Sequence, residues 1–408
     1  MKVAYLCEPQ FGGTYTFFRR VRPRLAAHGV DLRCVPPYSV GTFRGSPFEG
    51  AEGVDFLELP LEWSAPGALA AATKVMVEHL EREGYEAVII LPGCDILTTN
   101  IASYLPRRLR CAARVSLMAR GAYAPTRVVA DHLNAVVAVS HRVGHDLESA
   151  YGMPREILHI IYNGAELRPP RERPGPAGRP LRVIYSGRLT DLDKGTLQLP
   201  VILRKARAEG ADLFMTIIGE GPEAGRLREA FRREQVADRA ELLGTLPLGE
   251  VERRLKEADV FILPSRLEAC PNALLEAMAA GCTPAAFRIH DSVDRIVEDR
   301  ISGLLAPVGN TTALAKVLVR LARDRALCAR MGEAARQRIE QYFTAEQTAE
   351  QYAAVLRAMM KEADRRPAAR SLARYQIPRG LKPTWRTRIP APLKNLARKW
   401  LERFGRSS

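Results

Sequence analysis

The sequence ADVFILPSRLEACPNALLEAMAAGCTP, residues 258–284, contains a complete strand–loop–helix–strand unit. The apolar run Val260–Leu263 predicts a buried strand, and a second strand begins near Pro284. Pro271 suits the first turn of the helix between them, and Gly281 ends that helix. A strand, a helix and another strand in succession are typical of a parallel sheet covered by helices, so this stretch predicts an α/β fold.

The segments on either side repeat this alternation of short apolar runs and longer mixed segments. The runs are rich in Val and Ile and mostly unbroken by polar residues, as strands buried on both faces are. The predicted strands are Val3–Cys7, Leu32–Val35, Ala87–Leu91, Arg114–Met118, Ala135–Val139, Ile157–Tyr162, Leu181–Ser186, Leu213–Ile218, Glu241–Leu243, Val260–Leu263 and Pro284–Phe287. The predicted helices are Phe17–His28, Ala68–Glu83 and His141–Tyr151, each followed by a glycine, and further helices from Thr312 to about Asp364.

A proline-rich segment divides the chain. Residues 168–180 hold five prolines and two glycines in thirteen positions, a composition that indicates a linker. We therefore expect two doubly wound, Rossmann-like domains facing a cleft, a first domain of residues 1–167 and a second of residues 181–345. Residues 346–365 are expected to form a helix that packs back toward the first domain, and residues 366–408 a basic tail.

Composition excludes several classes of protein. Apolar residues make up 47% of the 408, which excludes a disordered chain, and no stretch approaches the roughly 18 apolar residues of a membrane-spanning helix. The apolar run after Met1 stops at Glu8-Pro9, too short for a signal peptide, so we interpret it as a strand. Seven scattered cysteines without a Cys-x-x-Cys pair favour buried thiols in a reducing, cytoplasmic compartment. No metal site is expected, because the histidines also lack metal-ligand spacing.

Most of the net charge of +15 resides in the tail. From Arg366 onward there are twelve Lys or Arg residues and one acid, so the tail carries +11 and the preceding 365 residues carry +4. Within residues 393–404 the apolar side chains fall on one helical stripe and basic ones populate the rest, which is typical of an interfacial helix on an anionic membrane. The alternative is a terminal helix docked on the protein itself. No nucleic-acid partner is expected, because no reader module accompanies the charge.

Residues with binding chemistry follow the strands of the second domain, where doubly wound sheets bind ligands. After the first of these strands, Gly187 allows a close backbone approach, and Arg188 and Lys194 put two cations beside one strand end, a pair able to neutralise a diphosphate. The alternative is two solvated surface cations. Gly219 and Gly244 follow the next two strands. Plain turns explain both glycines, although the backbone at Gly244 is able to meet a base edge.

The stretch quoted first holds two carboxylates and a helix start. Glu268 lies on the loop, where it can reach a sugar ring, and Glu276 lies in the helix, where it can accept both hydroxyls of a ribose. The amides of the first turn, at Asn272, Ala273 and Leu274, are free to bind an anion. Two exposed helix acids are the ordinary explanation for such a pair, but the flanking Pro-Ser and Gly-x-x-Pro make the spacing specific.

Taken together, these segments resemble those of a known family. The second domain is similar to the retaining GT-B glycosyltransferases of the family-4 type (glycosyl transferases group 1) in Gly187-Arg188-Leu189, Lys194-Gly195, Gly219-x-Gly221-Pro222, Gly244, Glu268-x7-Glu276 and Gly303-Leu304-Leu305. The first domain is similar in Val139-Ser140, Tyr151-Gly152 and Asn163-Gly164. The resemblance covers roughly residues 1–360.

The resemblance implies a hexosyltransferase with its acceptor side in the first domain and its donor side in the second. A sugar would move, with retention of configuration, from a nucleotide-sugar, for which a UDP-sugar is favoured, to a hydroxyl of a glycan or lipid-linked acceptor. Arg188 and Lys194 would bind the diphosphate, Glu276 the ribose and Glu268 the transferred sugar, so Arg188, Lys194 and Glu268 are the catalytic candidates. Gly12 and Gly13 resemble the family's glycine loop near phosphate and acceptor. Neither a cofactor nor a metal is required.

The first domain also departs from the family, which often has a His after a middle strand, close to the reacting sugar. Residues 116–121 contain none, and Arg120 and His132 are the candidates to replace it. The basic tail favours surface-polysaccharide or glycolipid assembly at the inner face of a membrane. The alternatives are a nucleotide-sugar epimerase or a sugar phosphorylase on the same fold, or a catalytically silent nucleotide-sugar-binding subunit.

Overall fold

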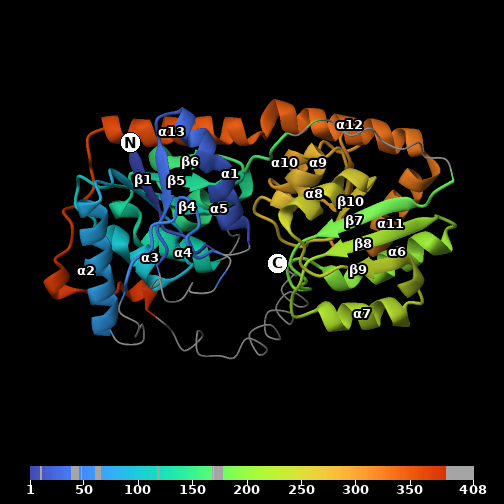
Figure 1. Ribbon diagram of the computed structural model, residues 1–408, viewed down its shortest axis with the longest axis horizontal. Helices are drawn as coiled ribbons and strands as arrows, with labels where there is room; N and C mark the ends of the chain where they lie inside the picture. Colours follow the sequence, from blue (N-terminus) through green and yellow to red (C-terminus); the bar gives the residue numbers. More distant parts are fainter. Residues whose placement is uncertain are drawn as a thin grey trace.

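The computed structural model describes residues 1–9, 12–37, 46, 48–59, 66–116, 120–167, 169 and 178–382. These residues form two six-stranded sheets whose neighbouring strands all run parallel, with helices flanking each sheet (Figure 1). The predicted α/β fold with two doubly wound domains is confirmed.

The first sheet has the strand order β2-β1-β3-β4-β5-β6. Its strands are β1 Lys2–Tyr5, β2 Asp31–Cys34, β3 Ala87–Ile90, β4 Arg110–Val115, β5 Ala135–Ala138 and β6 Leu158–Ile160. The helices of this domain are α1 Gly13–Ala27, α2 Pro66–Arg82, α3 Ile96–Asn100, α4 Arg120–Val128 and α5 His141–Tyr151. The predicted strand Arg114–Met118 was placed too late, because Cys111, Ala112 and Ala113 belong to β4. These small residues are buried on both faces of the sheet, and that burial outweighs their low strand propensity.

The second sheet has the order β12-β11-β10-β7-β8-β9. Its strands are β7 Leu181–Ser186, β8 Leu213–Ile218, β9 Ala240–Leu242, β10 Val260–Leu263, β11 Thr283–Phe287 and β12 Leu304–Ala306. The helices are α6 Leu199–Ala208, α7 Ala224–Arg233, α8 Leu248–Glu257, α9 Asn272–Ala279, α10 Val293–Ile296, α11 Thr311–Arg323 and α12 Arg325–Tyr342. The edge strand β12 was not predicted, because three residues are too short to produce a recognisable apolar run.

The chain passes between the domains twice, and the two crossings pair with each other. The Ala165 amide donates to the Phe343 carbonyl at 2.8 Å, and the Ala345 amide donates to the Ala165 carbonyl at 2.9 Å. A Cβ at Gly164 would lie 2.2 Å from the Thr344 carbonyl oxygen, so only glycine permits this approach. Thr344 also caps α13, Ala345–Lys361, through a reciprocal pair of hydrogen bonds with Gln347.

Helices α12 and α13 follow one another along one side of the molecule (Figure 1). α12 packs against α9 in the second domain, whereas α13 packs against α1 in the first. The residues after α13 stay on the first domain. The Arg366 guanidinium, which is 3% exposed, donates to the Leu109 carbonyl, and Tyr375 stacks on Tyr104 with ring centroids 4.9 Å apart. The predicted amphipathic stripe at 393–404 lies outside the described residues, as does most of the predicted linker.

Candidate functional site

The start of α1 in the first domain touches the start of α9 in the second. The Asn272 side-chain amide donates to the Gly13 carbonyl at 3.3 Å, and its oxygen accepts from the Asn163 side-chain amide at 2.8 Å. Gly13 follows β1 and Asn272 follows β10, so the carboxyl edges of the two sheets meet here. A Cβ at Gly13 would lie 3.2 Å from Asn272 Nδ2, which leaves little room for a side chain.

Lys194 and Glu268 form an ion pair within the second domain. Lys194 Nζ lies 2.8 Å from one carboxylate oxygen of Glu268 and 2.9 Å from the other, and the Ser265 hydroxyl donates to the first at 2.7 Å. Glu268 is only 6% exposed. The structure therefore brings together a cation and an acid 74 residues apart in the chain, both of which the sequence singled out. The two charges neutralise each other in this state, and Lys194 is held where it can turn to an anionic ligand.

Arg188 lies close by but is exposed. Its guanidinium is 3.2 Å from Asp193, and 65% of its side chain is accessible to solvent. Burial raises the pKa of Asp193, but the hydrogen bond from Thr190 and the charges of Lys194 and Arg188 outweigh it and lower that pKa. The carboxylate thus stays ionised, and Arg188 is free to move from it toward a ligand.

Three glycine turns lie side by side at the carboxyl edge of the second sheet. The Gly187 amide donates to the Ile218 carbonyl at 3.0 Å, and the Gly219 amide donates to the Gly244 carbonyl at 2.8 Å. Gly219 has φ 129°, and a Cβ there would lie 2.0 Å from the Gly187 carbonyl oxygen. Close packing of the turns therefore requires glycine at position 219. This packing explains the glycine whether or not its backbone also contacts a ligand.

The first turn of α9 is partly satisfied within itself. The Leu274 amide donates to the Pro271 carbonyl at 3.1 Å. No hydrogen bond found in the described part of the chain engages the amides of Asn272 and Ala273. These two amides are the ones available to an anion at the start of the helix.

Glu276, one turn further along α9, pairs with the first domain. Arg20 Nη2 of α1 lies 2.5 Å from Glu276 Oε1, while Arg20 Nη1 donates to the Gly164 carbonyl at 2.7 Å. Arg20 was not among the residues predicted from the sequence. Its partner is 256 residues away, and no local pattern distinguishes it from the neighbouring Arg19.

A cavity of about 390 Å³ lies between the domains beside this ion pair. Arg19, Arg20 and Glu276 line it, together with apolar side chains of the loop after β9 and of α8, namely Leu246, Leu248, Val251 and Leu255. Glu252 and Lys256 of α8 also line it, so charged and apolar side chains share the cavity. Such a lining suits a ligand that has both polar groups and a flat ring.

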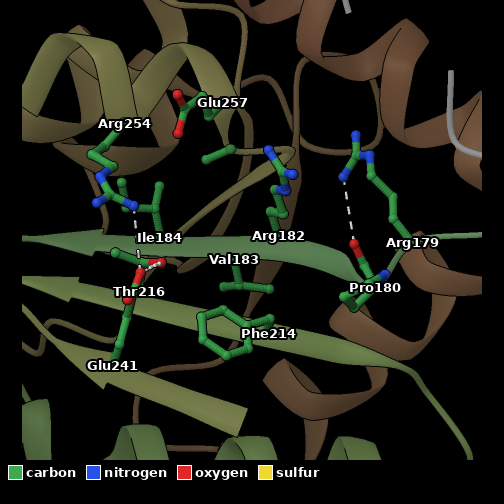
Figure 2. A pocket seen from close by; sticks show the side chains of 11 residues that line it. Arg179, Pro180, Arg182, Val183, Ile184, Phe214, Thr216, Glu241, Arg254 and Glu257 are labelled. Carbon is green, nitrogen blue, oxygen red and sulfur yellow. Dashed lines mark hydrogen bonds and ion pairs between the residues drawn. The ribbon is translucent and has the colours of Figure 1, made fainter. Parts of the chain in front are cut away.

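A second hollow, of about 320 Å³, lies against β7 and β8 beside α8 (Figure 2). Thr216 donates to Glu241 at 2.9 Å there, and Arg254 lies 3.6 Å from the same carboxylate. It is lined by the sides of the strands and contains none of the predicted site residues, so it is not the candidate site.

Arg120 and His132 were the candidates to replace the histidine that the family often has near the reacting sugar. His132 precedes β5, at the sheet edge opposite to the one that meets the second domain, and burial together with Arg370 lowers its pKa. It is therefore not at this site. Arg120 begins α4, but its side chain lies outside the described residues.

Among the described residues no group of three or more His, Cys, Asp or Glu is arranged to hold a metal ion. No helix in the same residues is long and apolar enough to cross a bilayer.

Comparisons with known proteins agree with this architecture. Residues 170–338 match the family model "Glycosyl transferases group 1". The amylovoran biosynthesis glycosyltransferase AmsK of Erwinia amylovora is 34% identical over 201 residues, 48% of this chain and 49% of that protein. WcaL of Escherichia coli K12, named for colanic acid biosynthesis, is 33% identical over 217 residues, 51% of this chain and 53% of that protein.

The chain thus spans about half the length of the curated relatives it matches. Among solved structures, Anabaena Alr3699/HepE in complex with UDP-glucose superimposes with a TM-score of 0.72 at 17% identity, covering 88% of this chain and all of that one. This likeness extends the similarity in fold to both domains. Together, the comparisons show that residues 170–338 are similar to the glycosyl transferases group 1 family and that the two-domain α/β fold is shared with the HepE structure.

Proposed function

We propose that this protein is a retaining hexosyltransferase of the family-4 type that moves a sugar from a UDP-sugar to a hydroxyl of a glycan or lipid-linked acceptor during exopolysaccharide assembly. The observation that carries the proposal is that the second domain holds both the Lys194–Glu268 ion pair and the free amides at the start of α9. Asn272, the first residue of α9, also contacts Gly13 of the first domain. The names of AmsK and WcaL support the polysaccharide setting, and UDP-glucose in HepE supports the donor class.

In the proposed complex the donor runs along the gap between the domains. The base lies in the cavity against Leu246 and Leu248, and the ribose hydroxyls donate to Glu276. The diphosphate reaches the amides of Asn272 and Ala273, where the helix start favours an anion. Gly12 leaves room beside it for the sugar and the acceptor, because a Cβ there would meet nothing within 4 Å, and Gly13 allows the close approach of Asn272.

The proposed chemistry depends on leaving-group charge. The bond from the anomeric carbon to the diphosphate oxygen breaks, and the acceptor oxygen forms its bond on the same face while its proton passes to the leaving phosphate. Lys194 and Arg188 turn from Glu268 and Asp193 toward the diphosphate and stabilise that charge. Glu268 is then released to accept hydrogen bonds from the sugar. Because protein cations cover the diphosphate, the proposal requires no metal.

We also propose that the enzyme works at the cytoplasmic face of a membrane, held there by residues 393–404. Lipid-linked acceptors reside at such surfaces, and the charge of the tail suits anionic lipid.

A panel of UDP-, GDP- and ADP-sugars, each incubated with the purified chain and an extract of lipid-linked glycans, tests the proposal. We expect UDP release that depends on the acceptor, and a product whose anomeric configuration, read by NMR, equals that of the donor. Inversion would overturn the retaining assignment. Epimerised donor without acceptor, phosphate-dependent cleavage, or nucleotide binding without turnover would favour the epimerase, the phosphorylase or the silent subunit respectively.

A further inference from the structure

Arg114, near the end of β4, is a buried cation without a counter-ion. It is 1% exposed and is the bulkiest of the fully buried side chains. Its Nη2 donates to Asn163 Oδ1 at 2.8 Å and its Nη1 to the Tyr5 hydroxyl at 3.4 Å, while the guanidinium lies 4.0 Å from the centroid of the Phe17 ring. In the part of the chain that the structure describes, no carboxylate pairs with it and its Nε has no hydrogen-bond partner.

The groups around Arg114 are neutral near pH 7. Burial raises the pKa of Tyr5 above its usual value, and it raises the pKa of the Cys270 thiol to about 12. A guanidinium cannot lose its proton in a protein, so the positive charge remains. Burying an unpaired charge is destabilising, and the contact with the face of Phe17 offsets only part of that cost.

Another deeply buried arginine does have a counter-ion. Arg366, at 3% exposure, lies 2.9 Å from Asp364 and donates to backbone carbonyls at the opposite end of β4. The lack of a counter-ion at Arg114 is therefore specific to the end of the strand that faces the second domain.

A chain of hydrogen bonds leads from Arg114 to the start of α9. Because a guanidinium only donates, Asn163 must turn its oxygen to Arg114 and its amide to Asn272, whose oxygen accepts at 2.8 Å. Asn272 in turn directs its own amide to the Gly13 carbonyl. Two short hydrogen bonds place the Asn272 side chain at most about 8 Å from the guanidinium. The unbalanced charge thus lies behind the helix start where the donor diphosphate is proposed to bind.

We propose that Arg114 is a positioning residue whose missing counter-ion is the diphosphate of the donor, reached through Asn163 and Asn272. The inference rests on the proposed function and adds a residue of the first domain to the binding of an anion held mainly by the second. Opposite charges at this separation attract more strongly in the protein interior than in water, because the effective dielectric constant there is lower. These hydrogen bonds join the two domains, so an anion bound there also favours the arrangement in which the domains touch.

Binding of UDP and of uridine to the full chain, measured by calorimetry, tests this role, because the two ligands differ only in the diphosphate. We expect Arg114→Gln to raise the UDP Kd about tenfold, or 1.4 kcal/mol, and to leave the uridine Kd unchanged. Arg114→Lys, which keeps the charge, should recover part of the loss. Arg366→Gln is the matched control for removing a buried arginine, and it should lower the melting temperature without changing the ratio of the two Kd values.

An unchanged ratio of UDP to uridine affinity in Arg114→Gln would overturn the inference while leaving the proposed function in place. Wild-type protein that binds neither UDP nor another nucleoside diphosphate would overturn both. Should Arg114→Gln fail to melt cooperatively, Asn163→Leu supplies the test. It interrupts the hydrogen bonds between Arg114 and Asn272 without adding a charge, so it should raise the UDP Kd and leave the uridine Kd unchanged. A wild-type ratio of the two Kd values in Asn163→Leu would again reject the role.

Discussion

Arg20 in the first domain and Glu276 in the second are joined by an ion pair of 2.5 Å between Nη2 and Oε1, 256 residues apart in the chain. The pair is partly shielded, with side-chain exposures of 10% and 22%. Arg20 is held in place from behind by the Gly164 carbonyl, at the point where the chain leaves the first domain. Arg20 therefore links Glu276, the residue proposed to bind the ribose, to Gly164, where the chain crosses between the domains.

Replacing Arg20 should impair donor binding. We expect Arg20→Ala to raise the KM for the donor about tenfold, or 1.4 kcal/mol, because Glu276 is then no longer oriented and the contact between the domains is weakened. Steady-state kinetics over a range of donor concentrations measures the effect. Arg204→Ala, which removes an exposed ion pair with Glu234, is the control and should behave as wild type. A wild-type KM in Arg20→Ala would remove Arg20 from the site.

Truncating the charged groups of the second domain should lower turnover. We expect Lys194→Ala and Glu276→Ala each to reduce kcat/KM at least about tenfold, because the first removes a cation from the leaving group and the second a ribose partner. Lys194→Ala also leaves the buried Glu268 without its partner, so its melting temperature should be measured beside its activity. Full activity in a folded Lys194→Ala protein would contradict the proposed role.

The packing of the glycine turns predicts a loss of stability on substitution. Gly219→Ala should lower the free energy of unfolding by about 1–3 kcal/mol, because φ is 129° and the new methyl group would collide with the Gly187 carbonyl. Urea denaturation measures it. Gly225→Ala, at an open position in α7, is the control and should instead stabilise the protein by about 0.5–1 kcal/mol. Equal midpoints for the two variants would refute the steric argument.

Asp364 should contribute a stability that depends on pH. Burial raises its pKa, but the hydrogen bonds from Arg366 and Asn134 outweigh this effect and lower the pKa to about 2. Because the folded pKa is depressed, the stabilisation is present above the unfolded pKa of about 4 and is lost as the pH falls toward about 2. Asp364→Asn should therefore cost up to about 2 kcal/mol at pH 7 and less at pH 3.

Chemical denaturation at both pH values checks this expectation. Asp238→Asn, at an exposed ion pair, is the control and should change stability by less than about 0.5 kcal/mol at either pH. A cost for Asp364→Asn that does not shrink at pH 3 would argue against an ionised carboxylate as its source.

The role of the tail is open to a direct binding test. Residues 366–382 pack on the first domain, so a truncation after Lys382 removes the rest of the tail without exposing that surface. The full chain should co-sediment with vesicles that contain anionic lipid, and the truncated chain should not, since the removed segment holds seven Lys or Arg residues. Neutral vesicles are the control. Equal sedimentation of both proteins would show that the residues after Lys382 do not bind the membrane.

Much of the architecture could be predicted because buried parallel strands leave unbroken apolar runs, as in Ala87–Leu91, and because glycines such as Gly152 end helices in a left-handed conformation. Strand boundaries were less predictable where packing outweighs propensity, as at Cys111–Ala113 in β4. The Lys194–Glu268 contact was not predictable as a contact, although both residues were, because nothing in a spacing of 74 residues specifies an ion pair.

The sequence by itself determined two parallel α/β domains and the residues with binding chemistry in the second, since strand periodicity, helix ends and local motifs are encoded by neighbouring residues. Only the tertiary structure decided which first-domain residues meet them. Arg20 reaches Glu276, and Arg114 reaches Asn272 through Asn163, because the paired crossings at Ala165 and Thr344 hold the two domains against each other. Such contacts depend on how two separately folded sheets are placed, and no local pattern records that placement.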